Sequence, residues 1–531
     1  MGAVAVAGSA YKLWEFKSQE AASKKRCNKL QSIGGPCVVV VGCGVSGILA
    51  GIKLQKAGIP FLIIEKENEI GGTWLLNQYP GCACDVPAHL YSFSFCPKTD
   101  WTTPFAPQAE ILEYLQSVVE KYKLRKHIRL NCQMINATWR ENESMWEIVC
   151  SDQTRLTVPF YIGAVGALHH PNYPPIDKTR FKGEQFHSAE WNPSWKSNGR
   201  RVAVVGSAAS AVQLVPEIAL DAEQVFVFQR TPNWIAPRVV PFVLPMEKYP
   251  DWLKTMFEYV PLLAKAHRLG IYIFQESFFW PLGIFDAGSK GARSTAAALT
   301  KNMEMQCQGN KKLAQKIIPK YAPGCKRICR VDKYIPALLR ENVELVTSGV
   351  AELEESSVID CEGNLYEVDT IIYATGFKVG SLGVNSSIHG ANGICVSGDD
   401  LAENAQEAFL GIVSPGFPNS FMLLGPNTAL GHNSVILMIE SQVEYIIRML
   451  TEAIDSDISR MEIRPQVVEE YYEWLWKEFD LRVWTHGGCS SWYQNKQGKI
   501  FSLWPSSTWN YFYTVATAPG ILESYHVQSK L

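Results

Sequence analysis

A glycine-rich turn near the start of the sequence is the first feature with a recognisable chemistry. Gly42-x-Gly44-x-x-Gly47 follows the apolar run 37–41, and an apolar segment suited to a helix follows the turn. Glycines at this spacing let backbone N–H groups approach a pyrophosphate at the N-terminus of a helix. Glu65 ends the next apolar run, about twenty residues further on, where a carboxylate can accept from both hydroxyls of an adenosine ribose. The segment therefore predicts a dinucleotide site, and the acidic residue disfavours a 2′-phosphate.

A second turn of this kind, Gly206-Ser-Ala-Ala-Ser-Ala211, follows the apolar run 201–205. Ala208 and Ala211 stand where the first turn has glycine, and the methyl group of Ala208 narrows the space for a pyrophosphate. Arg230 ends the next apolar run, in the position that Glu65 has in the first unit. A cation there suits a ribose 2′-phosphate and predicts NADP(H) rather than NAD(H). Alternatively, Arg230 is a solvated charge at the end of a strand and binds no phosphate.

Two different nucleotides indicate a flavin that is reduced by NADPH. We expect an α/β fold with two Rossmann-like dinucleotide-binding domains, in which the NADPH domain is inserted into the FAD domain. The predicted boundaries are an N-terminal extension over 1–35, the first part of the FAD domain over 36–168, the NADPH domain over 169–378, and the second part of the FAD domain over 379–531. The aromatic-rich segment at about 239–305 has a helical pattern and predicts an added helical subdomain.

Composition supports a multidomain enzyme and excludes several other classes. The chain has 531 residues, of which 47% are apolar and 19% charged, as expected for a protein that buries a core. The formal net charge is −2 and no long basic run occurs, which argues against a nucleic-acid partner. The most apolar later stretch, 270–285, is too short and too polar for a transmembrane segment.

Cysteine and histidine spacing does not predict a metal site. Fourteen cysteines are scattered through apolar runs, and we expect free buried thiols and a reduced compartment. The pairs Cys82/Cys84 and Cys325/Cys329 lack the spacing of a zinc site. No histidines show a helical metal-binding spacing.

Beyond the glycine turns, four further segments carry a family resemblance. The segment Gly71-Gly-Thr-Trp74-x-x-x-x-Tyr79-Pro-Gly81-x-x-x-Asp85 resembles, at every fixed position, a fingerprint of Baeyer–Villiger monooxygenases. Phe181-x-Gly183-x-x-x-His187-x-x-x-Trp191 is similar to the second fingerprint, although Asn192 stands where that family usually has Pro or Asp. The segments 374–377 and 425–427 also match, so the resemblance covers the chain from Pro36 onward and places it among the fungal-type members of the flavin-containing monooxygenase superfamily.

The resemblance implies a reaction and assigns residues to it. The implied activity uses FAD, NADPH and O2 to convert a small-molecule ketone to an ester or lactone through a flavin C4a-peroxide, with secondary metabolism as the expected setting. Arg327 would stabilise the peroxide and the adduct formed on the carbonyl, and Asp85 would orient Arg327. Lys326 would join Arg230 around the 2′-phosphate.

The same resemblance assigns the remaining side chains near the cofactors. The tryptophan at position 492 is expected to lie on a loop that closes on the nicotinamide, whereas His187 is expected to have a structural or conformational role in a domain linker. The expected cofactor-binding residues are Gly42, Gly44, Ser46, Gly47, Glu65, Gly72, Thr73, Trp74, Leu75, Leu76, Ala83, Cys84, Asp85, Tyr91, Gly206, Ser207, Ala208, Ala209, Ser210, Ala211, Arg230, Thr231, Lys326, Arg327 and Trp492.

Two rival functions remain open at this point. A flavin-containing monooxygenase that oxidises nitrogen or sulfur would share the fold and both cofactors, but such enzymes usually have Tyr or Phe in place of Trp191. A non-catalytic flavoprotein would not need Asp85 and Arg327. A flavin disulfide reductase is excluded, because no Cys-x-x-x-x-Cys follows the first turn.

The sequence ends in Ser529-Lys530-Leu531, a tripeptide that a peroxisomal import receptor reads as an address. We therefore expect a peroxisomal location and this receptor as a partner, with the cytoplasm as the location otherwise. At the other end, the first six residues lack the pattern of a signal peptide.

Overall fold

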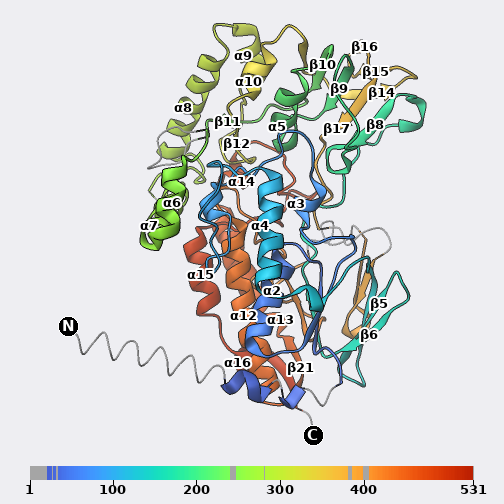
Figure 1. Ribbon diagram of the computed structural model, residues 1–531, viewed down its shortest axis with the longest axis vertical. Helices are drawn as coiled ribbons and strands as arrows, with labels where there is room; N and C mark the ends of the chain where they lie inside the picture. Colours follow the sequence, from blue (N-terminus) through green and yellow to red (C-terminus); the bar gives the residue numbers. More distant parts are fainter. Residues whose placement is uncertain are drawn as a thin grey trace, which may run out of the picture.

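A computed structural model describes residues 21–529 apart from 27, 31–33, 239–246, 280, 381–385 and 399–405. Two parallel sheets organise the molecule, one in each half of Figure 1. The first has the strand order β20(Ser420–Met422), β7(Phe160–Gly163), β1(Val38–Val41), β2(Phe61–Ile64) and β3(Ile128–Arg129), and all its strand pairs are parallel. Strand β1 is buried along its whole length, which explains its continuous run of valines.

The second parallel sheet has the order β13(Val343–Val346), β10(Gln224–Phe228), β9(Arg201–Val205), β17(Thr370–Tyr373) and β8(Glu184–His187). It lies between β7 and β20 in the sequence, and β20 pairs with β7. The chain thus leaves the first sheet, builds the second and returns. The predicted fold class, with one Rossmann-like domain inserted into another, is confirmed.

Smaller sheets complete the two halves. The largest has the order β19(Cys395–Ser397), β18(Ser387–His389), β4(Met134–Arg140), β5(Met145–Cys150) and β6(Arg155–Val158), with β18 parallel to β4 and the other pairs antiparallel. The others join β14(Val350–Leu353), β15(Ser357–Asp360) and β16(Leu365–Glu367), then β21(Ile458–Ile463) with β22(Tyr525–Ser529), and β11(Ile235–Ala236) with β12(Cys329–Arg330). Strand β12 of the last pair begins two residues after Arg327.

Helices cover both parallel sheets. In the first half these are α2(Val45–Ala57), α3(Thr73–Leu76), α4(Gln108–Lys121), α12(Val435–Asp455), α13(Pro465–Phe479), α14(Val483–His486), α15(Thr508–Ala516) and α16(Ile521–Ser524), and α12 packs on α2. In the second half they are α5(Ala209–Ile218) and α10(Tyr334–Leu338). None of the helices among the described residues is long and apolar enough to cross a membrane.

A set of helices follows β11 and stands along one side of Figure 1. It comprises α6(Asp251–Tyr259), α7(Pro261–Glu276), α8(Lys290–Gln306) and α9(Lys311–Ile317). The helical part thus extends beyond the predicted end at about 305. Its predicted start, 239–246, lies outside the described residues.

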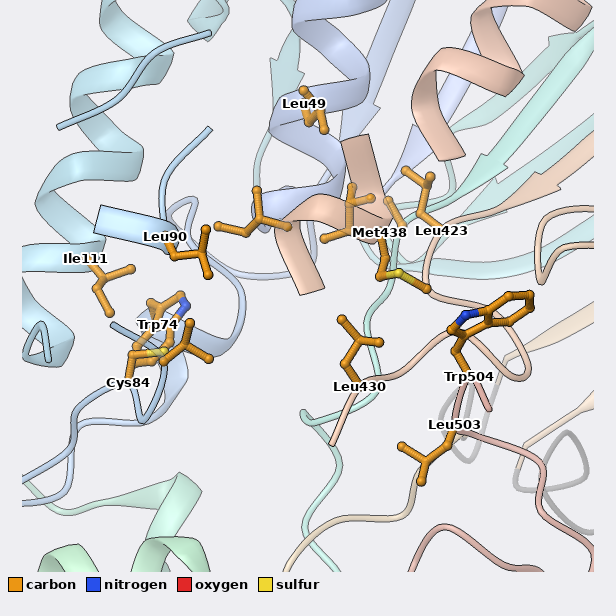
Figure 2. Close-up of a cluster of buried hydrophobic side chains, with 14 of the residues drawn as sticks. Leu49, Trp74, Cys84, Leu90, Ile111, Leu423, Leu430, Met438, Leu503 and Trp504 are labelled. Atoms are coloured by element: carbon orange, nitrogen blue, oxygen red, sulfur yellow. The ribbon is translucent and has the colours of Figure 1, made fainter. Parts of the chain in front are cut away.

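One large apolar cluster joins the two halves. Figure 2 shows Trp74, Cys84, Leu90 and Ile111 from the early part of the chain in this cluster, together with Leu430, Leu503 and Trp504 from the late part. Segments distant in sequence therefore pack around the same region, and this packing positions the residues described next.

Candidate active site

The first glycine turn connects β1 to α2 as predicted. A Cβ atom at Gly47 would lie 1.9 Å from the carbonyl oxygen of Gly42, so only glycine allows this close approach. Glu65 is buried at the end of β2, and its Oε2 accepts from the backbone N–H of Cys43 at 2.6 Å. Burial raises the pKa of Glu65, and hydrogen bonds from backbone N–H groups oppose the rise. Glu65 therefore holds the turn as well as offering a carboxylate at the position predicted for a ribose.

The fingerprint segment packs on this turn. The backbone N–H of Gly71 donates to the carbonyl oxygen of Cys43 at 3.0 Å, and Gly72 lies directly before α3, which contains the expected residues Thr73 to Leu76. The indole Nε1 of Trp74 donates to the hydroxyl of Tyr91 at 3.1 Å. These expected cofactor residues are thus brought together beside the first turn.

A contact that the sequence did not reveal joins the fingerprint to the second domain. Gln213 on α5 accepts from the hydroxyl of Tyr79 at 3.0 Å, and its amide nitrogen donates to the carbonyl oxygen of Ala83 at 3.0 Å. A Cβ at Gly81, where φ is +79°, would lie 2.6 Å from the carbonyl oxygen of Gln213. The Tyr-Pro-Gly part of the motif therefore docks one dinucleotide-binding domain onto the other.

The second glycine turn connects β9 to α5, with Ala208 exposed and Ala211 fully buried. Ser207 donates from its hydroxyl to the carbonyl oxygen of Thr231 at 3.3 Å, which ties this turn to the segment after Arg230. The pKa of Lys326 is lowered, first by burial and then by the positive charge of Arg230. The structure thus brings Lys326 near Arg230. Among the described residues, neither cation lies within ion-pair distance of a carboxylate.

Asp85 and Arg327 meet between the two sheets. Nε and Nη2 of Arg327 each donate to one oxygen of Asp85 at 2.6 Å, and Nη1 donates to the carbonyl oxygen of Leu430 at 3.1 Å. Burial opposes ionisation of both groups, but the mutual charge and the two hydrogen bonds outweigh it. They hold the pKa of Asp85 below and that of Arg327 above its ordinary value. Because 28% of the Arg327 side chain and 20% of the Asp85 side chain remain accessible, this fixed ion pair can still face a bound group.

A buried polar network lies beside the pair, and sequence reasoning missed it. Glu276 on α7 accepts from Asn433 Nδ2 at 2.6 Å and from Thr508 Oγ1 at 2.5 Å, and its Oε1 lies 3.3 Å from Nε2 of His432. Burial lowers the pKa of His432, and the neighbouring Glu276 opposes this shift. No motif marked these residues, since they come from separate helices and loops.

The expectation that all cysteines are free thiols was wrong. Cys325 is disulfide-bonded to Cys489 across 164 residues of sequence. The bond joins the residue directly before Lys326 to the segment that leads to Trp492. Other cysteines, such as Cys43, Cys84 and Cys329, are buried free thiols, as expected. Spacing could not reveal the pair, because only the tertiary fold brings the two segments together.

The remaining predicted residues have the following places. Trp492 is exposed and its ring centre lies 4.5 Å from that of Tyr493, whereas Tyr493 itself is buried. His187 is fully buried at the end of β8, and burial lowers its pKa to about 4. Cys132, Cys150 and Asp152 form a cluster of possible metal ligands, but Asp152 is already paired with Arg129 at 2.6 Å.

Comparisons with known proteins agree with this geometry. Residues 36–266 match the family model described as flavin-binding monooxygenase-like. The chain is 36% identical to a Baeyer–Villiger monooxygenase of Pseudomonas aeruginosa, over 89% of this chain and 88% of the relative. It is 35% identical to a Baeyer–Villiger monooxygenase of Streptomyces coelicolor, over 89% of each chain.

Solved structures agree as well. A closed crystal structure of cyclohexanone monooxygenase is 26% identical, with a TM-score of 0.79 over 93% of this chain and 99% of that one. A structure of OTEMO in complex with FAD and NADP is 26% identical, with a TM-score of 0.80 over 93% and 100%. Sequence identity, fold and the meeting of Asp85 with Arg327 all lead to one conclusion: the chain belongs to the Baeyer–Villiger monooxygenases of the flavin-binding monooxygenase-like family.

Proposed function

We propose that the protein binds FAD and NADPH and converts a ketone to an ester or lactone. The balanced reaction consumes ketone, O2, NADPH and a proton, and it releases ester, water and NADP⁺. The single observation that carries the proposal is the two-point ion pair of Asp85 with Arg327, which lies where the two dinucleotide-binding domains meet.

The residues present fit both cofactors. At the first turn Gly47 leaves no room for a Cβ, and Glu65 supplies a carboxylate for a ribose. At the second, Arg230 and Lys326 gather two cations for which the described residues provide no carboxylate, as a 2′-phosphate requires. Relatives support the assignment, since OTEMO was crystallised with FAD and NADP and a similar Aspergillus niger protein is named an FAD-binding monooxygenase.

Bound FAD, once reduced by NADPH, supplies the chemistry that activates O2. The side chains of the protein supply charge and position. Asp85 and the carbonyl oxygen of Leu430 fix three of the guanidinium nitrogens of Arg327, so its positive charge does not have to reorganise when negative charge develops on the reacting oxygen atoms. Leu430, whose carbonyl oxygen accepts from Arg327, belongs to the same large apolar cluster as Trp74, so apolar side chains adjoin the pair.

The test is product analysis with purified holoenzyme, NADPH and a panel of cyclic, linear and polyketide-like ketones, beside an amine and a sulfide. We expect esters or lactones that carry one atom of ¹⁸O from ¹⁸O2. Oxidation of only the amine and the sulfide would assign the protein to the heteroatom-oxidising monooxygenases. NADPH consumption that yields hydrogen peroxide with every ketone would leave the proposal without support.

We also propose that Ser529-Lys530-Leu531 directs peroxisomal import. The motif is the support: Ser529 ends β22 as an exposed residue, and the last two residues lie outside the described part of the chain. A fluorescent protein fused in front of the whole chain should form peroxisomal puncta in yeast, and removal of the tripeptide should disperse them. Cytosolic fluorescence of the intact fusion would contradict the proposal.

A further inference from the structure

A second, partly buried arginine lies beside the Asp85–Arg327 pair and has no role in the mechanism above. Arg330 ends β12, three residues after Arg327, and its backbone pairs with Ala236 of β11. Burial lowers the pKa of Arg330 to about 10, opposed by the negative charge of Asp85 and assisted by the positive charge of Arg327. The two guanidinium groups are therefore close enough to influence each other.

The hydrogen bonds of Arg330 are incomplete. Its Nη2 donates to Oε1 of Gln275 at 3.0 Å, and the guanidinium lies 5.3 Å from the ring centre of Phe278. Its Nη1 is buried and has no hydrogen-bond partner among the described residues. A buried guanidinium donor without an acceptor is costly, and because the Arg330 side chain as a whole is only partly buried, the guanidinium can still pair with a group from outside the chain.

Gln275 is held in place to orient this arginine. Only 1% of its surface is exposed, and its Nε2 donates to the backbone carbonyl oxygen of His432 at 2.6 Å. Since the amide nitrogen is used in this way, the amide oxygen must face Arg330. The side chain of Arg330 is therefore preorganised, with Nη2 satisfied and Nη1 without an acceptor.

The charges of the region do not balance. Both oxygens of Asp85 are taken by Arg327, and Glu276 is committed to Thr508, Asn433 and His432. No carboxylate of the described residues lies within ion-pair distance of Arg330. Two partly buried guanidinium groups thus lie near one carboxylate, which Arg327 occupies, and the missing partner of Arg330 is an anion.

We propose that Arg330 and Gln275 form a carboxylate-binding subsite next to the reaction centre, and that the substrate is a ketone that carries a carboxylate. This inference rests on the proposed function, since it names the substrate class of the same site. The carboxylate pairs with the partly exposed guanidinium of Arg330, which also lies over the ring of Phe278. Arg327 remains free to serve the reacting oxygen atoms.

The experiment compares keto acids with their own methyl esters, which differ in charge but share the ketone. In the parent holoenzyme we expect the acid to have the higher kcat/KM. Arg330→Met should reduce the acid-to-ester ratio by about tenfold or more, mainly through KM, because a charge-assisted hydrogen bond is lost. Arg238→Met is the matched control, since this arginine donates to the backbone oxygen of Arg330 but lacks an unpaired buried donor.

A second variant guards against a folding defect in Arg330→Met. Gln275→Glu keeps the size of the side chain, gives up the hydrogen bond to the His432 carbonyl oxygen and supplies a carboxylate to Arg330 from within the chain, so it should remove the preference for acids while neutral ketones still react. Equal acid-to-ester ratios in the parent, Arg330→Met and Gln275→Glu would overturn the proposal. Slower anaerobic flavin reduction in Arg330→Met, with acid and ester affected alike, would also overturn it and assign Arg330 to the flavin.

A binding measurement separates this proposal from the proposed function. Titration of the oxidised holoenzyme with each acid and ester, followed by flavin difference spectra, needs no turnover. Tighter binding of the acids in the parent and its loss in Arg330→Met would support the subsite even if no ester were formed. Equal affinity for both members of every pair would refute it even if esters were formed.

Discussion

Arg327 donates two hydrogen bonds of 2.6 Å to Asp85, and its third guanidinium nitrogen donates to the backbone carbonyl oxygen of Leu430. The three segments involved lie in the fingerprint, directly before β12, and shortly before α12. A single guanidinium therefore connects the first part of the FAD domain, the inserted domain and the late part of the chain. Its position depends on the correct assembly of all three.

Replacement of Arg327 by Ala should leave FAD binding and anaerobic reduction by NADPH in place but suppress ester formation. The first glycine turn and Glu65 are untouched, whereas the reacting oxygen atoms lose their fixed positive partner. Removal of one preorganised electrostatic group costs about 3–4 kcal/mol, or roughly a hundred- to a thousandfold in rate. Flavin bleaching and product mass spectrometry measure the two steps separately. Undiminished ester formation would remove Arg327 from the mechanism.

Replacement of Arg230 by Ala should raise KM for NADPH and leave NADH nearly unaffected, since only the 2′-phosphate contact is lost. We expect the parent to prefer NADPH at least about tenfold in kcat/KM, equivalent to about 1.4 kcal/mol. Lys326→Met should act in the same direction, because the structure places Lys326 within electrostatic reach of Arg230. Parent enzyme that uses both coenzymes equally would show that these cations do not select the phosphate.

The disulfide predicts a response to reductant. Cys489→Ser should lower the free energy of unfolding by about 2–5 kcal/mol, the range for loss of a native disulfide. The same bond ties Cys325, directly before Lys326, to the segment of Trp492, so KM for NADPH should also rise. Melting curves with and without dithiothreitol provide the check. A reductant should affect the parent and not the variant, and free thiols at both positions in a non-reducing peptide map would disprove the bond.

A buried and a partly buried histidine predict a loss of stability in mild acid. The rings of His89 and His267 meet edge to face, with their centres 4.9 Å apart. Burial lowers the pKa of His89 to about 3 and that of His267 to about 4. As the pH falls below about 6.5, protonation favours the unfolded chain, and the loss continues until the folded pKa is reached. At pH 5 each such histidine costs about 2 kcal/mol.

Replacement of His89 by Leu should therefore reduce the fall in melting temperature between pH 7 and pH 5. His526→Leu is a suitable control, since that residue is exposed on β22. The same slope in the His89 variant and in the parent would show that His89 does not carry this acid sensitivity.

Residues close in sequence could be interpreted without the structure. The turn at Gly42–Gly47, the run of valines before it and the acidic residue at the end of β2 follow from local backbone geometry, and the structure has them as predicted. The alternation of strand and helix was likewise sufficient to predict two Rossmann-like domains. The assignment of Asp85 and Arg327 to one site required a family resemblance, because no local pattern connects residues so distant in the chain.

Tertiary structure alone decided the rest. Gln213, Gln275 and Arg330 have no motif, and their roles arise because α5, α7 and β12 bring them against distant segments. The disulfide of Cys325 with Cys489 was hidden for the same reason. Periodicity and spacing report which residues share a strand, turn or helix face. They contain no information on which buried donor is left without an acceptor, since that depends on every element packed around it.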